Sequence, residues 1–565
     1  MVGAGLVCLP IMGMLKEPRL VLRRPRPQIA AVYRLEKRLG SLPVIADFSR
    51  RLDIAGVIDR ACPMRDVAHL SHGQVIEALV ANRLTSPRAM VAVADWARDW
   101  ALEEVYGIDP DDLNDDRLGR ALDALAPRVD SIVGSIGATA ITAFGIDTAR
   151  LHWDMTSISL YGAYPQTDDD HPAPAYGHPK DRRTDLKQIQ AGMAVAGDGG
   201  IPVFHRAYDG NAAEVAQVVG TMHALQSVAT PRGFLLVGDS KLISYTNVTA
   251  MTGAGTTFLA PLAAARVPDG LFASLDPTTA TRVDYVAERD QDTPLWHQQG
   301  TYRVLEDTMG LTGPRKRDPV HTVRRILVHS SANATAAVKS RALKLGRART
   351  DLDTLARTAG THHQPTVEAV TAKATAIARR RKVTGYLQAT ITTDDTGKPA
   401  FAWTFDQAAL DAEAATDGWY ALLTNLPADV DATEVLLRYK DQPMVERRYG
   451  EFKGPLAVAP MFLRSNRRIT ALITVICLAL LIFCLIEREV RRNLAPEFDM
   501  GGFYRNDGRY RRPTGRLILQ ALGELRLIPA PPGQPGTPAT IPKPDYLQNR
   551  LLKLLHVDPT QPRWP

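Results

Sequence analysis

Three acidic residues stand in sequence surroundings that suit metal-dependent chemistry. Asp154 lies in a strand-like segment among apolar and hydroxyl side chains, where an unpaired carboxylate is costly to bury. Asp239 follows the apolar run 234–237, and open α/β sheets bind ligands at the carboxyl ends of such strands. Glu446 lies on a helix that we expect to begin at Pro443, a residue suited to a first helical turn. Each acid alone also fits an ordinary turn or solvated position, so the prediction depends on their combination.

The chemistry that such a combination serves is phosphodiester transfer. Carboxylate oxygens are the hard ligands that Mg²⁺ prefers, and Mg²⁺ keeps open positions for water and phosphate oxygens. Two such ions, about 3.5–4 Å apart, activate the attacking oxygen and stabilise the leaving oxygen. Asp154, Asp239 and Glu446 therefore predict a site for two Mg²⁺ ions, with Mn²⁺ as a substitute.

Basic side chains near the acids are candidates for contact with the phosphates of DNA. Two arginines directly follow the glutamate, and a lysine further along shares its helix face. A second basic group lies in a loop after the first predicted strand, and the alternative interpretation of that loop is a solvated segment. The candidates are Arg447, Arg448, Lys453, Lys180 and Arg182.

Length and composition limit the class of protein. The chain has 565 residues, enough for about three or four domains. Its 45% hydrophobic and 23% charged residues are close to globular averages, which excludes a disordered or fibrous protein. The net charge of +7 favours a polyanionic partner. Four cysteines without a CxxC pair argue against a disulfide scaffold and a cysteine-based zinc site, and they fit a reducing compartment.

One apolar segment raises the question of a membrane. Residues 469–486 carry no charge and reach the lower length limit of a membrane span. A helix that is apolar all round also suits the core of a large protein, so both interpretations stay open at this point. The apolar residues 1–14 lack a preceding basic region and a small-residue cleavage site, so we do not expect a signal peptide.

The pattern of apolar residues places the acids on an α/β layer. Helical periodicity dominates residues 28–147, with helix starts at Ser71 and Asn114. Alternating and continuous apolar runs then predict three strands, a helix and a further strand, which is the first half of an RNase H-like layer. These elements are expected at 150–159, 190–195, 202–206, 212–228 and 234–237.

The remaining patterns divide the chain into segments. A strand at 323–329 and a charged helix at 333–357 indicate an insertion, and a strand at 419–424 returns to the core. Prolines concentrated between 529 and 544 indicate a tail. We therefore expect a flexible basic arm, either solvated or in contact with DNA, at 1–27, a helical N-terminal domain at 28–147, the first half of the core at 148–254, an insertion domain at 255–412, the second half of the core at 413–500 and a tail at 501–565.

The order of these features resembles the DDE transposases of bacterial insertion sequences. The resemblance is to the IS-four-type group, whose acidic helix carries the pattern Y-x2-R-x3-E-x6-K. Here the four positions are Tyr439, Gln442, Glu446 and Lys453, so glutamine replaces the family's arginine at one phosphate contact. Further similar stretches place the resemblance between about residues 60 and 495; they are residues 114–125, 151–162, 177–188 and 208–211.

The resemblance implies a fold and an activity. The fold is α/β, with an RNase H-like core interrupted by an α+β insertion domain and preceded by an all-α N-terminal domain that binds DNA. The activity is cut-and-paste transposition of an insertion sequence. One strand is hydrolysed at the terminal inverted repeats, and the freed 3′-hydroxyl attacks target DNA. Family members act on paired DNA ends as dimers, so a homodimer is also implied.

The resemblance also assigns roles to single residues. Trp296 would stack a flipped base at the transposon end, although a tryptophan in an insertion domain also suits its core. Residues 469–486 would pack on the sheet behind the catalytic glutamate rather than span a membrane. Three acids would hold the metal ions and two residues of the signature would position phosphates, namely Asp154, Asp239 and Glu446, and Tyr439 and Lys453.

These implications describe a cytoplasmic, nucleoid-associated bacterial protein without a membrane anchor. Two rival classes stay open. One is a catalytically inactive DNA-binding descendant of a transposase, and the other is a membrane-anchored protein that uses residues 469–486. A metal-dependent nuclease that never joins strands would need the same acids, and the sequence does not separate it from a transposase.

Overall fold

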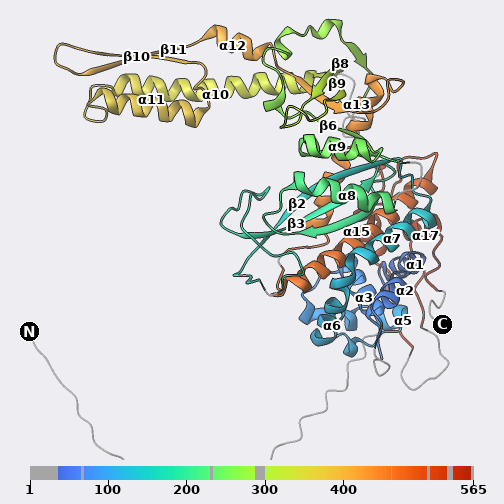
Figure 1. Cartoon of the computed structure of the whole chain (residues 1–565). Helices are drawn as coiled ribbons and strands as arrows, with labels where there is room; N and C mark the ends of the chain where they lie inside the picture. Colours follow the sequence, from blue (N-terminus) through green and yellow to red (C-terminus); the bar gives the residue numbers. More distant parts are fainter. Residues whose placement is uncertain are drawn as a thin grey trace, which may run out of the picture.

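A nine-stranded mixed sheet, with strand order β4-β3-β2-β5-β6-β12-β9-β8-β7, organises the protein into a mixed α/β fold. The basic arm 1–27 and Trp296 lie outside the residues that the structure describes. The computed structural model (Figure 1) describes residues 36–64, 69–166, 168–228, 233–286, 300–459, 461–504, 509–530 and 539–560.

The first five strands of this order form the layer that carries two of the predicted acids. β2 lies at the centre of this layer, antiparallel to β3 and parallel to β5. β4 and β6 are the outer strands, and α8 connects β4 to β5. The predicted order of three strands, a helix and a further strand is therefore confirmed. The bounds are Arg150–Leu160 for β2, Lys187–Ala196 for β3, Pro202–Tyr208 for β4, Glu214–Val228 for α8, Leu235–Val237 for β5 and Thr257–Pro261 for β6.

The same sheet continues into the region expected to be a separate insertion. β12 is antiparallel to both β6 and β9, and β8 and β7 follow at the edge. The sequence does not predict β8, because most of its side chains are polar or only half buried and give no core-strand pattern. Helix α9 (Tyr245–Gly253) lies between β5 and β6 in the chain, and the strand bounds are Thr281–Val283 for β7, Tyr302–Leu311 for β8, His321–Ser330 for β9 and Trp419–Thr424 for β12.

An arm of two long helices and a hairpin extends sideways from this end of the sheet (Figure 1). α10 follows β9 directly, and α11 packs beside it. The hairpin of β10 and β11 covers the helices and closes a small separate core around Leu352, Ile377 and Phe401. The bounds are Ser331–Thr358 for α10, Val367–Arg381 for α11, Leu387–Thr393 for β10, Pro399–Phe405 for β11 and Gln407–Ala414 for α12, which leads back to β12.

Helices α1 to α7 precede the sheet. The hydroxyl of Ser71 accepts a hydrogen bond from the Gln74 main-chain N–H at 3.1 Å, and the Ser71 N–H donates to the Gln74 side chain at 2.9 Å. This capping box and the Asn114 cap confirm both predicted helix starts. The bounds are Leu42–Arg51 for α1, Ile54–Ala61 for α2, His72–Thr85 for α3, Val93–Asp99 for α4, Leu102–Tyr106 for α5, Asp115–Leu125 for α6 and Val129–Phe144 for α7.

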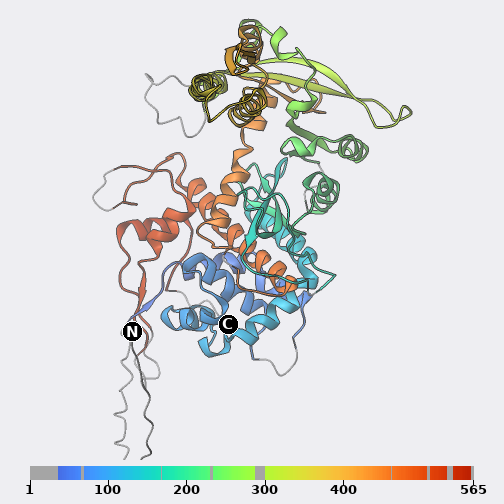
Figure 2. The same cartoon turned by 90° about the vertical axis from the view of Figure 1, so that its left-hand side faces the viewer.

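Helix α15 (Asn466–Leu494) runs between the N-terminal helices and the sheet (Figures 1 and 2). It packs against α3, α6 and β4, which explains why it is apolar on every side. Among the described residues it is the one helix long and apolar enough to cross a membrane, and its most apolar window is wholly buried inside the protein. The described cysteines, Cys62, Cys477 and Cys484, are buried and free.

The region expected to be a tail contains regular structure. α16 and α17 pack on α15, and β13 pairs with β1 near the start of the described chain. These helices are amphipathic, with leucines on the face that meets α15, and this spacing is visible in the sequence. The bounds are Lys37–Arg38 for β1, Gly515–Leu522 for α16, Arg526–Leu527 for β13 and Tyr546–Leu554 for α17.

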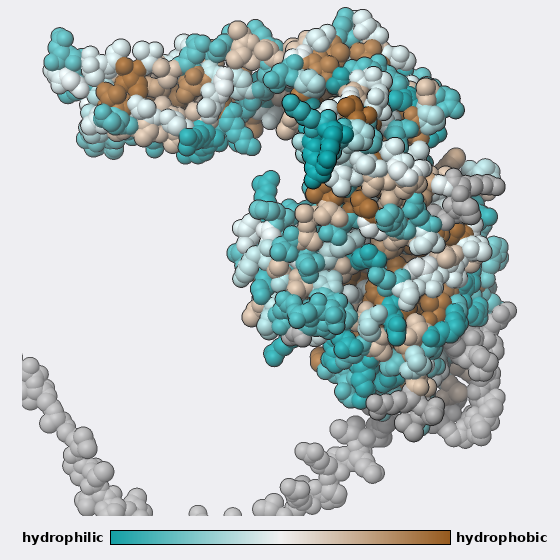
Figure 3. Space-filling model, viewed as in Figure 1, coloured by the Kyte–Doolittle hydropathy of each residue, from teal (hydrophilic) through white to brown (hydrophobic). Residues whose placement is uncertain are grey.

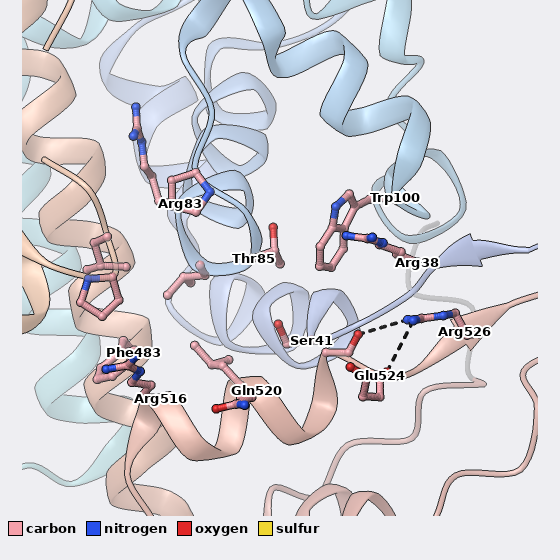
Figure 4. A pocket seen from close by; sticks show the side chains of 16 residues that line it. Arg38, Ser41, Arg83, Thr85, Trp100, Phe483, Arg516, Gln520, Glu524 and Arg526 are labelled. Carbon is pink, nitrogen blue, oxygen red and sulfur yellow. Dashed lines mark hydrogen bonds and ion pairs between the residues drawn. The ribbon is translucent and has the colours of Figure 1, made fainter. Parts of the chain in front are cut away.

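A pocket of about 460 Å³ lies where α16 and β13 meet the N-terminal helices (Figure 4). Trp100 and Thr85 line it from the N-terminal helices, and Gln520 and Arg526 line it from the C-terminal region. It contains none of the predicted site residues, so this pocket is separate from the acidic site.

Two further helices, α13 (Ala432–Lys440) and α14 (Pro443–Lys453), follow β12, and a buried ion pair fixes α14 to α15. Glu487 on α15 lies 3.0 Å from the guanidinium of Arg448 on α14 and accepts a hydrogen bond from the Gly515 N–H at 2.8 Å. Glu487 and Arg448 are 5% and 7% exposed. The pair therefore connects the predicted acidic helix to the core helix and to the C-terminal region.

Removing Glu487 should destabilise the whole protein. We expect Glu487→Ala to lower the free energy of unfolding by about 3–5 kcal/mol, because it leaves the buried Arg448 charge without its carboxylate partner. Glu434→Ala is the control, since it removes only the exposed pair with Arg438 and should cost less than about 1 kcal/mol. Urea denaturation measures both changes, and equal losses would contradict the structural role of Glu487.

Candidate functional site

Asp154 and Asp239 are brought together by the parallel pairing of β2 and β5. His152 on β2 lies opposite Val237 on β5, so the two acids stand two residues further along neighbouring strands. Asp239 comes directly after the end of β5, where its side chain accepts a hydrogen bond from the Lys241 N–H at 2.8 Å. Two of the three predicted acids therefore meet at the carboxyl end of a central strand.

The third acid in this cluster is Glu214, the first residue of α8. Oxygen atoms of Asp154, Glu214 and Asp239 all lie within 4.8 Å of one another. Asp154 is 6% exposed and Glu214 is 9% exposed, so both are buried beside the more open Asp239. Three converging carboxylates are a suitable donor set for a hard divalent cation such as Mg²⁺.

Two lysines neutralise much of the charge of these acids. The Lys180 ammonium lies 3.1 Å from both carboxylate oxygens of Asp154. Lys241 forms an ion pair with Glu214, and its ammonium is 3.8 Å from Asp239. Both lysine side chains are about half exposed, so they can turn toward solvent when a divalent cation binds the acids.

Burial dominates the protonation of the cluster. Burial raises the pKa of Asp154 above its usual range, and Lys180 partly offsets this effect. Burial also raises the pKa of Glu214, and the neighbouring charge of Asp239 raises it further. A cation requires ionised ligands, so proton release accompanies metal binding at this site.

Glu446, the third predicted acid, lies on the exposed side of α14 and does not belong to the cluster of three. Tyr439 connects the two groups. Burial raises the pKa of Tyr439 to about 12, and the charges of Asp239 and Glu446 both contribute to this increase. The Tyr439 hydroxyl therefore lies in the electric field of both acids, which links Glu446 electrostatically to the site.

Two contacts hold α14 on the strand that carries Asp154. The side chain of Gln442 lies 3.0 Å from His152 Nδ1 and donates to the Trp153 carbonyl at 3.4 Å. The Tyr449 hydroxyl donates to the main-chain carbonyl of Asp154 at 2.7 Å. Gln442 stands where the signature described above has arginine. It is 8% exposed, and its contacts with His152 and Trp153 fix α14 to β2.

Lys453, the last residue of α14, is influenced electrostatically by residues of the cluster and of its neighbouring loop. Burial lowers the pKa of Lys453, and the charge of Lys180 lowers it further, while Asp181 and Asp154 act in the opposite direction. Lys453 is exposed despite this partial burial of its ammonium group. Lys180 therefore supplies positive charge directly beside Asp154, and Lys453 adds to the positive potential there.

The other predicted DNA-binding residues have different positions. Arg182 and Arg447 are exposed. Arg448 does not fit the predicted phosphate contact, because its guanidinium is buried against Glu487 and donates to the carbonyl oxygens of Gly199 and Gly200. The sequence shows only that Arg448 is a basic residue two positions after Glu446. The burial of the Arg448 side chain depends on packing between distant segments.

Glu214 is the site residue that the sequence does not single out. It lies at the start of a helix, where an acid usually stabilises the helix dipole and needs no further function. The available signal is its position three residues after the stretch 208–211, which belongs to the family-like motifs. Only the packing of α8 beside β2 and β5 reveals that it faces Asp154 and Asp239.

The fold and the site together define a mixed α/β protein whose central sheet carries a carboxylate cluster suited to a divalent cation. Residues 35–131 match the model of a domain of unknown function, DUF4277, which covers the N-terminal helices from α1 to α6. No curated protein matches the sequence.

One solved structure with some similarity is a cryo-EM structure of a piggyBac transposase synaptic complex with hairpin DNA. The two chains share 9% sequence identity with a TM-score of 0.37, and the match covers 85% of this chain and 79% of that chain. A TM-score at this level does not establish a shared fold.

Binding of Mn²⁺ should become tighter as the pH rises. Asp154 and Glu214 have raised pKa values, so protons compete with the metal until both side chains are ionised. Isothermal titration with Mn²⁺ over a pH series measures this dependence. Asp154→Asn should abolish the binding, and the exposed Asp111→Asn should leave it unchanged. Equal affinities for wild type and Asp154→Asn would show that the cluster does not hold the metal.

The same substitution should stabilise the metal-free protein. Below the ordinary carboxyl pKa, Asp154 is protonated in both folded and unfolded states and makes no difference. As the pH rises through the raised folded pKa, the buried carboxylate costs the wild type stability. We therefore expect Asp154→Asn to be more stable by roughly 0.5–2 kcal/mol near neutral pH, with no gain in acid. Chemical denaturation at two pH values tests this, and a loss of stability at neutral pH would contradict it.

Proposed function

We propose that this chain is a DDE-type DNA transposase that cuts and joins DNA at the terminal inverted repeats of an insertion sequence. One observation carries the proposal: Asp154 and Asp239 meet on neighbouring parallel strands, and the helix that bears Glu446 is fixed to the first of these strands. Three antiparallel strands, a connecting helix and two parallel strands are also the arrangement expected of an RNase H-like core.

Asp154, Asp239 and Glu446 are the proposed metal ligands. Two Mg²⁺ ions, with Mn²⁺ as a substitute, would supply activation of the attacking oxygen and stabilisation of the leaving oxygen when bound. Glu214 lies inside the same acidic cluster, so it is a second candidate for the third ligand. Its ion pair with Lys241 also lets it serve as a positioning residue for Asp239.

The basic residues around the acids have proposed roles in holding DNA. Lys180 neutralises Asp154 in the metal-free protein and becomes free to contact a phosphate when a cation takes over that carboxylate. Lys453 lies close enough to share the same phosphate region, and Arg182 and Arg447 extend the basic surface. The Tyr439 hydroxyl is protonated near neutral pH, as an ordinary tyrosine is, and its raised pKa keeps it so at higher pH. It can therefore donate a hydrogen bond to a phosphate oxygen.

The proposed partners are duplex DNA and a second copy of the chain. DNA ends would be bound by the N-terminal helical domain and joined in a complex of two subunits. We propose that the protein is cytoplasmic and nucleoid-associated, with α15 as a helix of its core and not a membrane span. The role of α15 as a core helix is supported by the burial of its most apolar window within the protein.

An assay of strand cleavage and joining tests this function. Its substrate is labelled DNA that carries the terminal inverted repeats of the insertion sequence. We expect activity with Mg²⁺ for the wild type and a loss of at least about 10²–10³-fold for Asp239→Asn, because a charged ligand at the reacting phosphate is removed. Asp111→Asn is the matched control on an exposed carboxylate. Cleavage without joining would instead indicate a nuclease, and binding without cleavage would indicate an inactive descendant.

Two further variants separate the candidates for the third ligand. Glu446→Gln should reduce cleavage as strongly as Asp239→Asn if Glu446 binds the metal. Glu214→Gln should then cause a smaller loss, on the order of 10-fold to 100-fold, as expected of a residue that positions a ligand. The reverse order of these effects would assign the metal to Asp154, Glu214 and Asp239.

A further inference from the structure

The positive charge of the chain is concentrated in the two helices of the arm. Residues 331–382 contain 11 lysines and arginines but only 3 acidic residues, a net charge of +8, while the whole chain carries +7. The rest of the chain is therefore close to neutral. A charge excess of this size on two helices of one module is a strong electrostatic feature and calls for a polyanionic partner.

Some of these basic residues only stabilise the arm. Arg341 pairs with Asp417 and Glu413 at the base of the arm. Arg380 and Arg381 both pair with Asp351, which joins α11 to α10. These side chains have a structural partner and are not part of the surface considered below.

Six other basic residues of the arm are exposed and have no carboxylate within 4.0 Å among the described residues. Three of them are on α10, one is in the middle of α11, and two are at or near the carboxyl end of α11. The contact of Asp351 with Arg380 and Arg381 places the carboxyl end of α11 beside the part of α10 that carries Arg347 and Arg349. These residues, called here the arm cations, are Lys339, Arg347, Arg349, Lys373, Arg379 and Lys382.

The helix layer of the arm faces the main body of the protein. In Figure 1 the hairpin of β10 and β11 lies on the outer side, and α10 and α11 lie on the side toward β2 and β3. The space-filling view in Figure 3 shows a hollow between the underside of the arm and the body. With 28 residues, α10 is about 42 Å long, slightly more than one helical turn of duplex DNA.

Charge and surface composition favour DNA over a protein partner. The exposed large apolar residues on the two helices, Val338 and Leu343, do not form an extended apolar patch. Long basic side chains on a rigid helical frame are suited to phosphate contacts without base readout. The hairpin and the segment through α12, residues 383–417, carry six acidic residues and one lysine. Pairing with the arm of a second copy is therefore the competing explanation that the experiment must separate.

We propose that the arm cations form a second DNA-binding surface, which binds the phosphate backbone of duplex DNA across the hollow from the acidic site. This surface acts independently of base sequence and holds a duplex against the body. The inference rests on the proposed function only in taking DNA as the partner. It assigns to the arm the sequence-independent binding of DNA, a role separate from those proposed for the acids and the signature residues.

A variant of the arm that lacks four positive charges tests this surface. Arg347→Gln, Arg349→Gln, Arg379→Gln and Lys382→Gln are combined in the full-length protein, and binding to a labelled random-sequence duplex is measured by anisotropy across a salt series without divalent cations. The plot of log K against log salt concentration has a negative slope, and each lost phosphate contact reduces its magnitude by about 0.9. We expect the magnitude of this slope to decrease by about 2–4 and the affinity at moderate salt to decrease at least 10-fold.

A matched variant controls for the change in net charge. It combines Arg511→Gln, Arg516→Gln, Lys543→Gln and Lys553→Gln, four exposed residues of the C-terminal region. This variant should keep nearly the wild-type slope. Equal losses in both variants, or none in the arm variant, would overturn the proposal. Circular dichroism and thermal melting should show that both variants remain folded.

Two additional outcomes separate this inference from its alternatives. Sedimentation velocity should show the same assembly state for wild type and arm variant, and loss of a dimer with unchanged DNA affinity would assign the arm to a second copy. If wild type cleaves DNA but the arm variant binds it equally well, only this inference fails. If wild type binds no DNA, the proposed function fails as well.

Discussion

The parallel pairing of β2 with β5 is the constraint on which the site depends. It places Asp154 and Asp239 side by side at the end of a buried strand, and α8 adds Glu214 to the same place. Three carboxylates held this closely repel each other and are costly to bury. Lys180 and Lys241 offset part of that cost, and the raised pKa values of Asp154 and Glu214 show that the offset is incomplete. The remaining electrostatic cost favours binding of a cation.

The second support of the site is the buried helix α15. It lies between the N-terminal helices and the sheet, and its Glu487 binds the Arg448 side chain of α14. From the next position of α14, Tyr449 contacts the main chain of Asp154. The position of Glu446 therefore depends on a helix that is fixed to β2 on one side and to the core helix on the other. This arrangement explains why an apolar segment long enough for a membrane is needed inside the protein.

Local patterns in the sequence were sufficient for most of the sheet that carries the site. The apolar run before Asp239 and the capping residues Ser71 and Asn114 identify their elements because the signals are local. Glu214 and the burial of Arg448 depend instead on contacts between segments far apart in the chain, which no local pattern contains. β8 escaped prediction because it lies at the polar end of the sheet, and α16 and α17 because the nearby prolines dominate that region.

Iron-mediated cleavage of the polypeptide tests the central claim most directly. Fe²⁺ bound in place of Mg²⁺ reduces added hydrogen peroxide to hydroxide and a hydroxyl radical, and the radical cuts the main chain near the bound ion. The account predicts cuts close to Asp154, Glu214 and Asp239, at three places far apart in the sequence, and suppression of these cuts by excess Mg²⁺. The proposed ligand set also predicts a cut near Glu446, and cuts at the cluster without one near Glu446 would assign the third ligand to Glu214. Absence of cuts at the cluster, or cuts that Mg²⁺ does not suppress, would contradict the claim that these acids form a divalent cation site.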